Sequence, residues 1–261
     1  MKKILSILSV SLFALALVVL AGYGFWQYRN GKVKKIVVHI QRQGAQGFLS
    51  EKKIKSLINA QDKVVGYPVK TVNSAQIEKV ISKNPYVKNV DVYLSILGNI
   101  MVNVTERIPL LRIYNLKNRS RYVDMKGNIF PLSSYFVPRV LPVNGYVKAR
   151  LITGKNIHDS LYRHTLLPGL YSLAKKIRAN PFLEADISQL FVNSKGEIDM
   201  VPELGRHIIH FGDSNQMDVK LENLEAFYKQ VFVREGWSKY RSINLEFTNQ
   251  IVCTKKQSYG K

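Results

Sequence analysis

The segment Val87-Lys-Asn-Val-Asp-Val-Tyr-Leu94 alternates apolar and polar residues, which predicts a β-strand with one buried face. The turn residues Gly98-Asn99 follow it, and Ile100-Met-Val-Asn-Val104 alternates in the same way. The sequence therefore predicts a β-hairpin over residues 87–104, and this hairpin sets the fold of the region around it.

One strand and two helices precede this hairpin. The β-branched run at residues 36–40 predicts the strand. Ser50 is placed to cap a first helix, and Asn73 with Gln76 has the spacing of a capping box for a second helix. The order strand, helix, helix, strand, strand predicts a small α+β domain over residues 36–108.

The second half of the chain is richer in strands. The predicted strands lie at residues 110–114, 121–124, 129–132, 187–192, 197–201, 207–211 and 242–247 (the last with a continuation at 251–253), and the predicted helices at 168–180 and 218–234. The segment 133–145 contains Pro138 and Pro142 and is expected to be irregular. We therefore predict a β-rich domain with two or more helices over residues 109–253, a polar tail at 254–261, and an α+β fold class.

The N-terminal segment is the longest uncharged part of the chain. No residue from Ile4 to Tyr28 carries a charge, and a helix of this length spans roughly 37 Å, enough to cross a hydrocarbon core of about 30 Å. We therefore predict a transmembrane helix at residues 4–28, between a short segment 1–3 and a basic linker 29–35. The aromatic residues expected at the membrane interface are Tyr23, Phe25, Trp26 and Tyr28.

A cleaved signal peptide is the alternative to this anchor. Signal peptides have a shorter apolar core, of about 7–15 residues, and small residues at the cleavage site, where this chain has aromatic ones. These differences favour a retained helix. More basic residues follow the helix than precede it, which favours a cytoplasmic C-terminal side, but long folded domains are translocated largely regardless of charge. Charge alone leaves the orientation open.

Basic residues outnumber acidic ones by 39 to 18, for a formal net charge of +21. Since only Lys2 and Lys3 precede the apolar segment, about +19 lies after it. This charge favours acidic partners, anionic lipid or nucleic acid, although a solvated basic surface also accounts for it. The basic residues are scattered without interleaved aromatic residues, so nucleic acid is not expected as a partner. Cys253 is the only cysteine, which excludes an internal disulfide.

Motifs for catalysis or metal binding are weak in this sequence. Ser172 and Lys175 have Ser-x-x-Lys spacing, but the companion motifs of the penicillin-binding enzymes are absent. His207 and His210 would lie on opposite faces of a strand and could not bind one metal ion together. No phosphate-binding loop is found. We therefore expect no catalytic, cofactor or metal site, and a binding protein rather than an enzyme.

The last predicted strand is a candidate binding surface. Only a short polar tail follows it, so an edge position would leave its backbone N–H and C=O groups able to pair with a partner strand. The alternative is an ordinary edge strand, at which Lys255 and Lys256 prevent pairing with other chains. The predicted site consists of Ile243, Leu245 and Phe247 on one face of the strand and Ser242, Asn244 and Glu246 on the other.

Five segments behind the apolar helix are similar, in the same order, to motifs of the bacterial cell-division FtsQ/DivIB family. They are Val104-Thr-Glu-Arg-Ile-Pro109, Tyr122-Val-Asp-Met-Lys-Gly-Asn-Ile-Phe130, the strand at 205–212, Lys220-Leu-Glu-Asn-Leu224, and Ile243-Asn-Leu-Glu-Phe-Thr-Asn249. The strand-helix-helix-strand-strand order resembles the POTRA domain of that family. The resemblance covers nearly the whole chain.

The resemblance implies a non-enzymatic scaffold in the bacterial cytoplasmic (inner) membrane, enriched at the division septum. It implies a cytoplasmic N-terminus at residues 1–3 and an extracytoplasmic body. The implied partners are FtsB-like and FtsL-like coiled-coil proteins and, indirectly, FtsW/FtsI-like septal synthases, with FtsB binding by strand addition at residues 242–247. Asn244 and Glu246 replace the family's Asp and Arg, and Gln250 its Gly, so the facing charges of a partner should differ.

Two other functions are compatible with parts of the sequence. A wall-modifying serine enzyme would use Ser172 and Lys175. A POTRA-bearing export component would carry a membrane β-barrel after the first domain, but the second half has amphipathic helices and lacks a clear series of lipid-facing strands. We expect the division scaffold.

Overall fold

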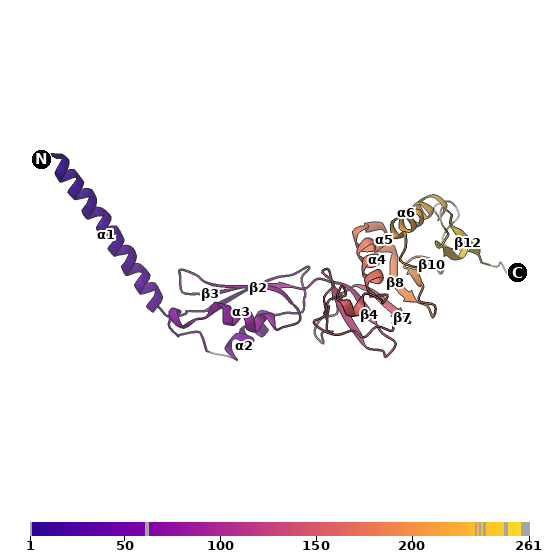
Figure 1. Ribbon diagram of the computed structural model, residues 1–261, viewed down its shortest axis with the longest axis horizontal. Coiled ribbons are helices and arrows are strands. Elements are labelled where there is room, and N and C mark those ends of the chain that lie inside the picture. The colour runs from indigo at the N-terminus through magenta and orange to yellow at the C-terminus, as the bar shows by residue number, and fades with distance from the viewer. Residues whose placement is uncertain are drawn as a thin grey trace. The chain divides into compact units, whose positions relative to one another are not determined.

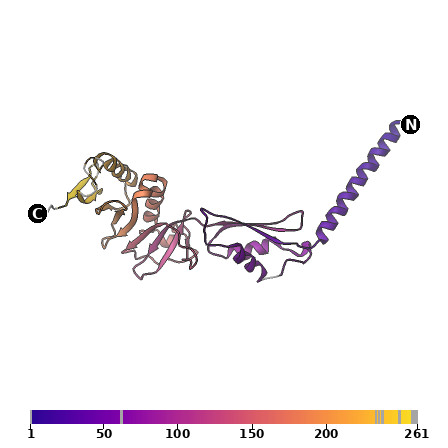
Figure 2. The same cartoon turned by 180° about the vertical axis from the view of Figure 1, so that it is seen from behind.

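The computed structural model describes residues 2–60, 63–232, 234, 236, 239–247 and 250–256, without the side chains of 2–10 and 27–29. The chain divides into two compact units, Met1–Glu106 and Arg107–Lys261. In Figures 1 and 2 the first unit runs from indigo to purple and the second from magenta to yellow. Each unit has its own sheet.

The first unit begins with helix α1 (Lys2–Asn30). Its described apolar side chains are exposed, including Tyr23 at 59%, Phe25 at 62% and Trp26 at 62%. The rings of Tyr23 and Trp26 stack with their centroids 6.2 Å apart, whereas the side chain of Tyr28 lies outside the described part. Among the described residues, no helix combines the length and the apolar composition that crossing a membrane requires. The interface role of these aromatic residues stays a prediction.

The remainder of the first unit is a three-stranded sheet with two helices packed on it (Figure 1). Strand β1 (Ile36–Gln41) pairs in parallel with β3 (Ile100–Glu106), which pairs antiparallel with β2 (Val87–Leu94). Helices α2 (Glu51–Asn59) and α3 (Ser74–Ser82) follow β1 in sequence, with the short 3₁₀ helix Val69–Thr71 between them. Ser50 caps α2 and Asn73 caps α3, which confirms both predicted caps.

A buried carboxylate lies at the C-terminal end of the first unit. Glu106, the last residue of β3, is only 4% exposed and accepts hydrogen bonds from the backbone N–H of Phe48 (3.2 Å) and Leu49 (2.9 Å). A Cβ atom at Gly47 would lie 2.2 Å from this carboxylate, so a larger residue there would have to displace the Glu106 side chain. The acidic residue of the Val-x-Glu-Arg-x-Pro motif therefore ties the loop before α2 to the end of the sheet.

The described residues of the second unit form a nine-stranded sheet in the order β12-β11-β10-β9-β8-β7-β4-β5-β6. The strands are β4 (Pro109–Tyr114), β5 (Ser120–Asp124), β6 (Ile129–Phe130), β7 (Leu141–Gly145), β8 (Ile187–Val192), β9 (Ile198–Pro202), β10 (Ile208–Gly212), β11 (Tyr240–Asn244) and β12 (Val252–Lys255). Three pairings are parallel, β4 with β7, β7 with β8 and β10 with β11, and the others are antiparallel. Together with the first unit this confirms the α+β class.

Helices gather on one face of this sheet (Figures 1 and 2). They are α4 (Leu167–Ala179), α5 (Pro181–Asp186) and α6 (Met217–Phe227), which continues as a π-helix over Tyr228–Phe232. A 3₁₀ helix, Ser160–Tyr162, precedes α4 in the chain. One face of α4, with Leu170, Leu173, Ala174 and Ile177, is buried in the core.

Strand β7 and helix α5 of the second unit were not predicted from the sequence. Strand β7 lies inside the segment 133–145 that was expected to be irregular. Proline is normally excluded from central strands, yet Pro142 pairs in register with Arg112 of β4, and the next residue, Val143, is fully buried between β4 and β8. Burial of the flanking residues outweighs the lost N–H donor. The short helix α5 was also missed; the side chain of Asn180 caps it.

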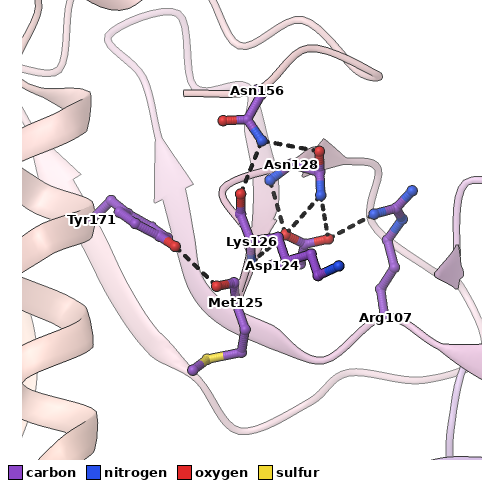
Figure 3. Close-up of polar contacts among 7 residues, drawn as sticks. All are labelled: Arg107, Asp124, Met125, Lys126, Asn128, Asn156 and Tyr171. Atoms are coloured by element: carbon purple, nitrogen blue, oxygen red, sulfur yellow. Dashed lines mark hydrogen bonds and ion pairs between the residues drawn. The ribbon is translucent and has the colours of Figure 1, made fainter. Parts of the chain in front are cut away.

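One buried carboxylate stabilises the β5–β6 hairpin through hydrogen bonds, which Figure 3 shows. Asp124, 3% exposed, accepts hydrogen bonds from the Arg107 guanidinium (2.7 Å), from the backbone N–H of Lys126 (2.8 Å), and from the backbone (2.9 Å) and side chain of Asn128. The amide of Asn156 donates to the backbone carbonyl of Lys126 at 2.9 Å. The motif Asp-x-x-Gly-x-x-Phe is thus a hairpin, as predicted, and its Asp is the centre of the network.

Candidate protein-binding edge

The C-terminal strands form one end of the nine-stranded sheet. The strand that was predicted as its edge, at residues 242–247, does not lie at that edge. Strand β11 pairs in parallel with β10 on one side and antiparallel with β12 on the other. The prediction that residues 242–247 form the edge of the sheet is therefore wrong. Residues 252–255 turn back as a separate strand instead of continuing β11, and β12 is the last strand in the order.

The side chain of Asn244 explains why β11 ends earlier than predicted. Its Oδ1 accepts a hydrogen bond from the backbone N–H of Glu246 at 2.7 Å, and its Nδ2 donates to the Glu246 carboxylate at 3.2 Å. A side chain that bonds the backbone two residues on forms a turn and competes with the strand ladder. Asn244 and Glu246, two of the three positions at which the sequence differs from the motif it resembles, are therefore partners within this chain.

The predicted site residues fall into two groups. Ile243 is fully buried and Leu245 is 3% exposed, so both belong to the core and are not accessible to a partner. Phe247 is 48% exposed. Ser242 and Asn244 lie in the β11 ladder, opposite Thr254 and Val252 of β12, and Glu246 is exposed just beyond the strand. Binding by this set as a whole stays a prediction, and its exposed part is Glu246 and Phe247.

Strand β12 has the properties expected of a strand-accepting edge. Among the described residues it pairs only with β11, so the backbone groups on its other side are unpaired within the sheet. Val252 is 44% exposed, Thr254 and Lys255 are exposed, and Cys253 is half-buried. Lys255 is the last residue of the strand and lies opposite Tyr240 of β11. Three residues of the strand therefore precede its first basic residue.

A buried lysine holds helix α6 against the strand behind this edge. The amine of Lys220 donates to the carbonyl oxygens of Phe211 (3.0 Å) and Asp213 (3.1 Å) and to the Asp213 carboxylate (3.0 Å). The hydrogen bond from Lys220, together with the N–H of Asn215, lowers the pKa of Asp213. Gly212, at φ +77°, leaves room for the side chain of Glu246, which a Cβ atom there would meet at 2.6 Å. The lysine of the Lys-Leu-x-x-Leu motif thus fixes β10, the neighbour of β11.

A buried polar cluster lies under the same end of the sheet. His207, 2% exposed, contacts the Tyr228 hydroxyl through Nε2 at 2.9 Å, and its Nδ1 has no hydrogen-bond partner among the described residues. Burial lowers the pKa of His207 to about 4, and the charge of Lys256 adds to this. Burial raises the pKa of Asp186 to about 6, opposed by the Tyr228 hydroxyl. Sequence reasoning missed this cluster, because its members are far apart in the chain.

The residues weighed for chemistry have structural positions. Ser172 and Lys175 lie on α4, where the amine of Lys175 is 5.8 Å from the centroid of the Tyr171 ring. His210 pairs with Asp199 at 2.7 Å. Within the described residues, no group of three or more histidine, cysteine or acidic side chains could hold a metal ion.

Two family models match the chain, one on each unit. A model described as FtsQ/DivIB, C-terminal related, matches residues 108–254. A POTRA-like domain model matches residues 32–105. No curated protein matches the chain. The first match covers more than half of the chain and includes the whole nine-stranded sheet up to β12.

Proposed function

This chain belongs to the FtsQ/DivIB family of non-enzymatic division proteins, and on that premise we propose that it is a membrane-anchored scaffold of the bacterial divisome. It binds FtsB-like and FtsL-like coiled-coil proteins and through them links FtsW/FtsI-like synthases to the septum. The observation that carries this proposal is the free edge of β12, at the C-terminal end of the matched region.

Strand addition is the mode of binding that this edge favours. A partner strand laid against β12 would form main-chain hydrogen bonds, which supply affinity without depending on side-chain identity. The exposed side chains of Phe247 and Val252 supply apolar contacts, and neighbouring Glu246 supplies an acidic one. A partner segment with apolar residues flanked by a basic one therefore fits this end of the sheet.

The apolar helix α1 acts as the anchor in this proposal. Its sequence from Ile4 to Tyr28 carries no charge, and the described apolar side chains of α1 are exposed. Family membership favours a cytoplasmic N-terminus and a body outside the cytoplasm. Confinement to a membrane raises the effective concentration of partners that are anchored in the same membrane, so a modest strand-addition affinity would be enough to hold the complex together.

Photo-crosslinking in cells tests the proposal. A benzophenone amino acid at position 252, on β12, should capture the FtsB-like protein in carbonate-washed membranes. The same probe at position 161 is the matched control, because Leu161 is also an exposed apolar residue of the second unit, at 56%. Equal capture at both positions, or none at 252, would contradict the edge. Recovery of the chain in the carbonate-soluble fraction would contradict the anchor.

A further inference from the structure

A second concave surface of the second unit lies at the turn between β4 and β5. One wall of this cleft is the turn at residues 115–119, and the other is the segment 148–153 after β7; the volume enclosed is about 660 Å³. The backbone N–H of Leu116 donates to the carbonyl of Val147 at 3.1 Å, and the amide of Asn115 donates to the carbonyl of Ala149 at 3.5 Å. The two walls are therefore joined by hydrogen bonds, and we name the space between them the basic cleft.

The turn that forms the first wall is held in one conformation. Oδ1 of Asn115 accepts hydrogen bonds from the backbone N–H of Lys117 (3.1 Å) and of Arg119 (3.0 Å). Asn118, between them, has a positive φ of 54°. The two basic residues on this wall are thus presented by a defined turn rather than by an open loop.

The charges in the basic cleft are all of one sign. Five cationic side chains line it, two lysines and three arginines, and none of the described lining residues is acidic. The five are Lys117, Arg119, Arg121, Lys148 and Arg150. None of them forms an ion pair within the described part of the chain. The positive potential of the cleft is therefore not compensated by the protein itself.

Another cleft of the same unit shows that this is not a general property of a basic chain. It encloses about 630 Å³ and is lined by Arg139 and Arg178 together with Glu184 and Glu203. The guanidinium of Arg178 and the carboxylate of Glu184 are 2.7 Å apart. Two clefts of similar size thus differ in charge, one balanced by its own acids and one left positive.

One guanidinium in the basic cleft is oriented by uncharged partners. Nε of Arg121 donates to the Thr153 hydroxyl at 3.2 Å, across the cleft, and one of its terminal nitrogens donates to the carbonyl of Ser120 at 2.8 Å. These bonds position the planar group without neutralising it, and they leave further N–H groups for a ligand. A guanidinium held in this way is suited to bidentate binding of an anion.

We propose that the basic cleft binds a ligand with two or more phosphate groups. A phosphate group concentrates a charge of about −1.5 to −2 in a small volume, so two or three of them can match five cations within one cleft. No aromatic side chain is among the described residues that line the cleft, so they offer no surface on which a nucleobase could stack. The site is independent of β12 and does not rest on the proposed division role.

Calorimetric titration of the full chain in detergent with inorganic tripolyphosphate tests this inference. The double variant Arg121→Gln, Arg150→Gln should weaken binding at least about tenfold, since it removes charge-assisted hydrogen bonds from both walls. The control is Arg139→Gln, Lys195→Gln, which removes the same charge from exposed positions elsewhere in the unit and should change the affinity less than about twofold. Thermal unfolding of each variant verifies that it is folded.

Two results would overturn the inference. The first is equal weakening by both double variants, which would mean binding to the overall charge. The second is binding of hexaglutamate as tightly as tripolyphosphate, which would mean a site for acidic peptides. If phosphatidylglycerol vesicles displace tripolyphosphate, the natural phosphates belong to lipid head groups; if they do not, the ligand is a soluble oligophosphate. Either of these last results supports the site.

Discussion

The two ends of the nine-stranded sheet are built in opposite ways. At one end the outer side of β6 is covered, because the backbone of Ile129 exchanges hydrogen bonds with Lys155 (2.8 Å) and Gly154 (2.9 Å). Behind it Asp124 binds four groups of its surroundings. At the other end β12 has one neighbouring strand among the described residues, and those residues are exposed or half-buried. Within the described part of the chain, the outer backbone groups of the first end are paired and those of the second are not.

This difference separates stability from binding within one sheet. Natural proteins cover or charge an exposed edge strand because it can pair with other chains. The covered β6 end follows that rule, whereas the β12 end places its lysine only at the last position of the strand. We infer that the β6 end maintains the fold and that the β12 end is available for a partner. The predictions below test this division of roles, from the largest expected effect on stability to the smallest.

Removing the carboxylate at the covered end should have the largest effect. Asp124→Ala leaves the Arg107 guanidinium and two backbone N–H groups without their acceptor. Loss of one partner from a buried ion pair costs about 3–5 kcal/mol, and we expect the free energy of unfolding of the second unit to fall by at least about 3 kcal/mol. Urea unfolding followed by circular dichroism measures this change.

Asp218→Ala is the matched control for that experiment. Asp218 also pairs with a basic residue, Lys176, but its side chain is 71% exposed. Exposed ion pairs contribute about 0–1 kcal/mol, so this variant should stay close to the parent. A similar loss in both variants would mean that the Asp124 network has no special role in the stability of the sheet.

The buried cluster of His207, Tyr228 and Asp186 lies under the β12 end of the sheet. It should make the stability of that end depend on pH through two opposing contributions. Asp186 has a folded pKa of about 6, above its ordinary value of 3.8, so its contribution is present at low pH and is lost as the pH rises through 6. His207 has a folded pKa of about 4, below its ordinary 6.5, so its contribution is present above 6.5 and is lost as the pH falls through 4. Between pH 4 and 6 the two oppose each other.

Single substitutions should separate the two contributions. In His207→Gln only the aspartate part remains, so the free energy of unfolding should fall as the pH rises from 4 to 6, relative to the parent. In Asp186→Asn only the histidine part remains, and the stability should rise with pH over the same interval. Urea midpoints at pH 4, 5, 6 and 7 give the slopes. Identical slopes in the two variants would show that this cluster does not control the response.

Local signals in the sequence were sufficient for the first unit and for part of the second. The caps at Ser50 and Asn73 and the hairpin at Asp124 depend on residues within a few positions, and the structure confirms them. Strand β7 was missed because it depends on pairing between distant segments. Pro142 argues locally against a strand, yet the neighbours of β7 are β4 and β8, and β8 lies more than forty residues further along.

The extent of the strand predicted at residues 242–247 was wrong for a different physical reason. Apolar alternation at Ile243, Leu245 and Phe247 suggested a continuous strand, but the Asn244 side chain ends the ladder by bonding the backbone of Glu246. The short strand β12 has little alternation of its own and is defined by its pairing with β11. Asparagine within an apolar alternation is the local signal that could have indicated an early strand end.

The smallest effect on stability, and the largest on binding, is expected when a lysine is introduced on β12. Val252→Lys adds a charge at an exposed position of β12, where surface substitutions change the free energy of unfolding by about 0.5 kcal/mol or less. If the proposed function is right, it should nevertheless abolish co-purification of the FtsB-like protein, because lysine on an edge strand opposes pairing with another strand. Ile129→Lys, at a position 1% exposed in β6, buries the same charge and should cost about 3 kcal/mol or more. Two results would show that the two ends of the sheet do not differ in role: retention of the partner by Val252→Lys, or equal destabilisation of the two variants. The reason is that only an uncovered edge can gain a charge, stay folded and still lose its partner.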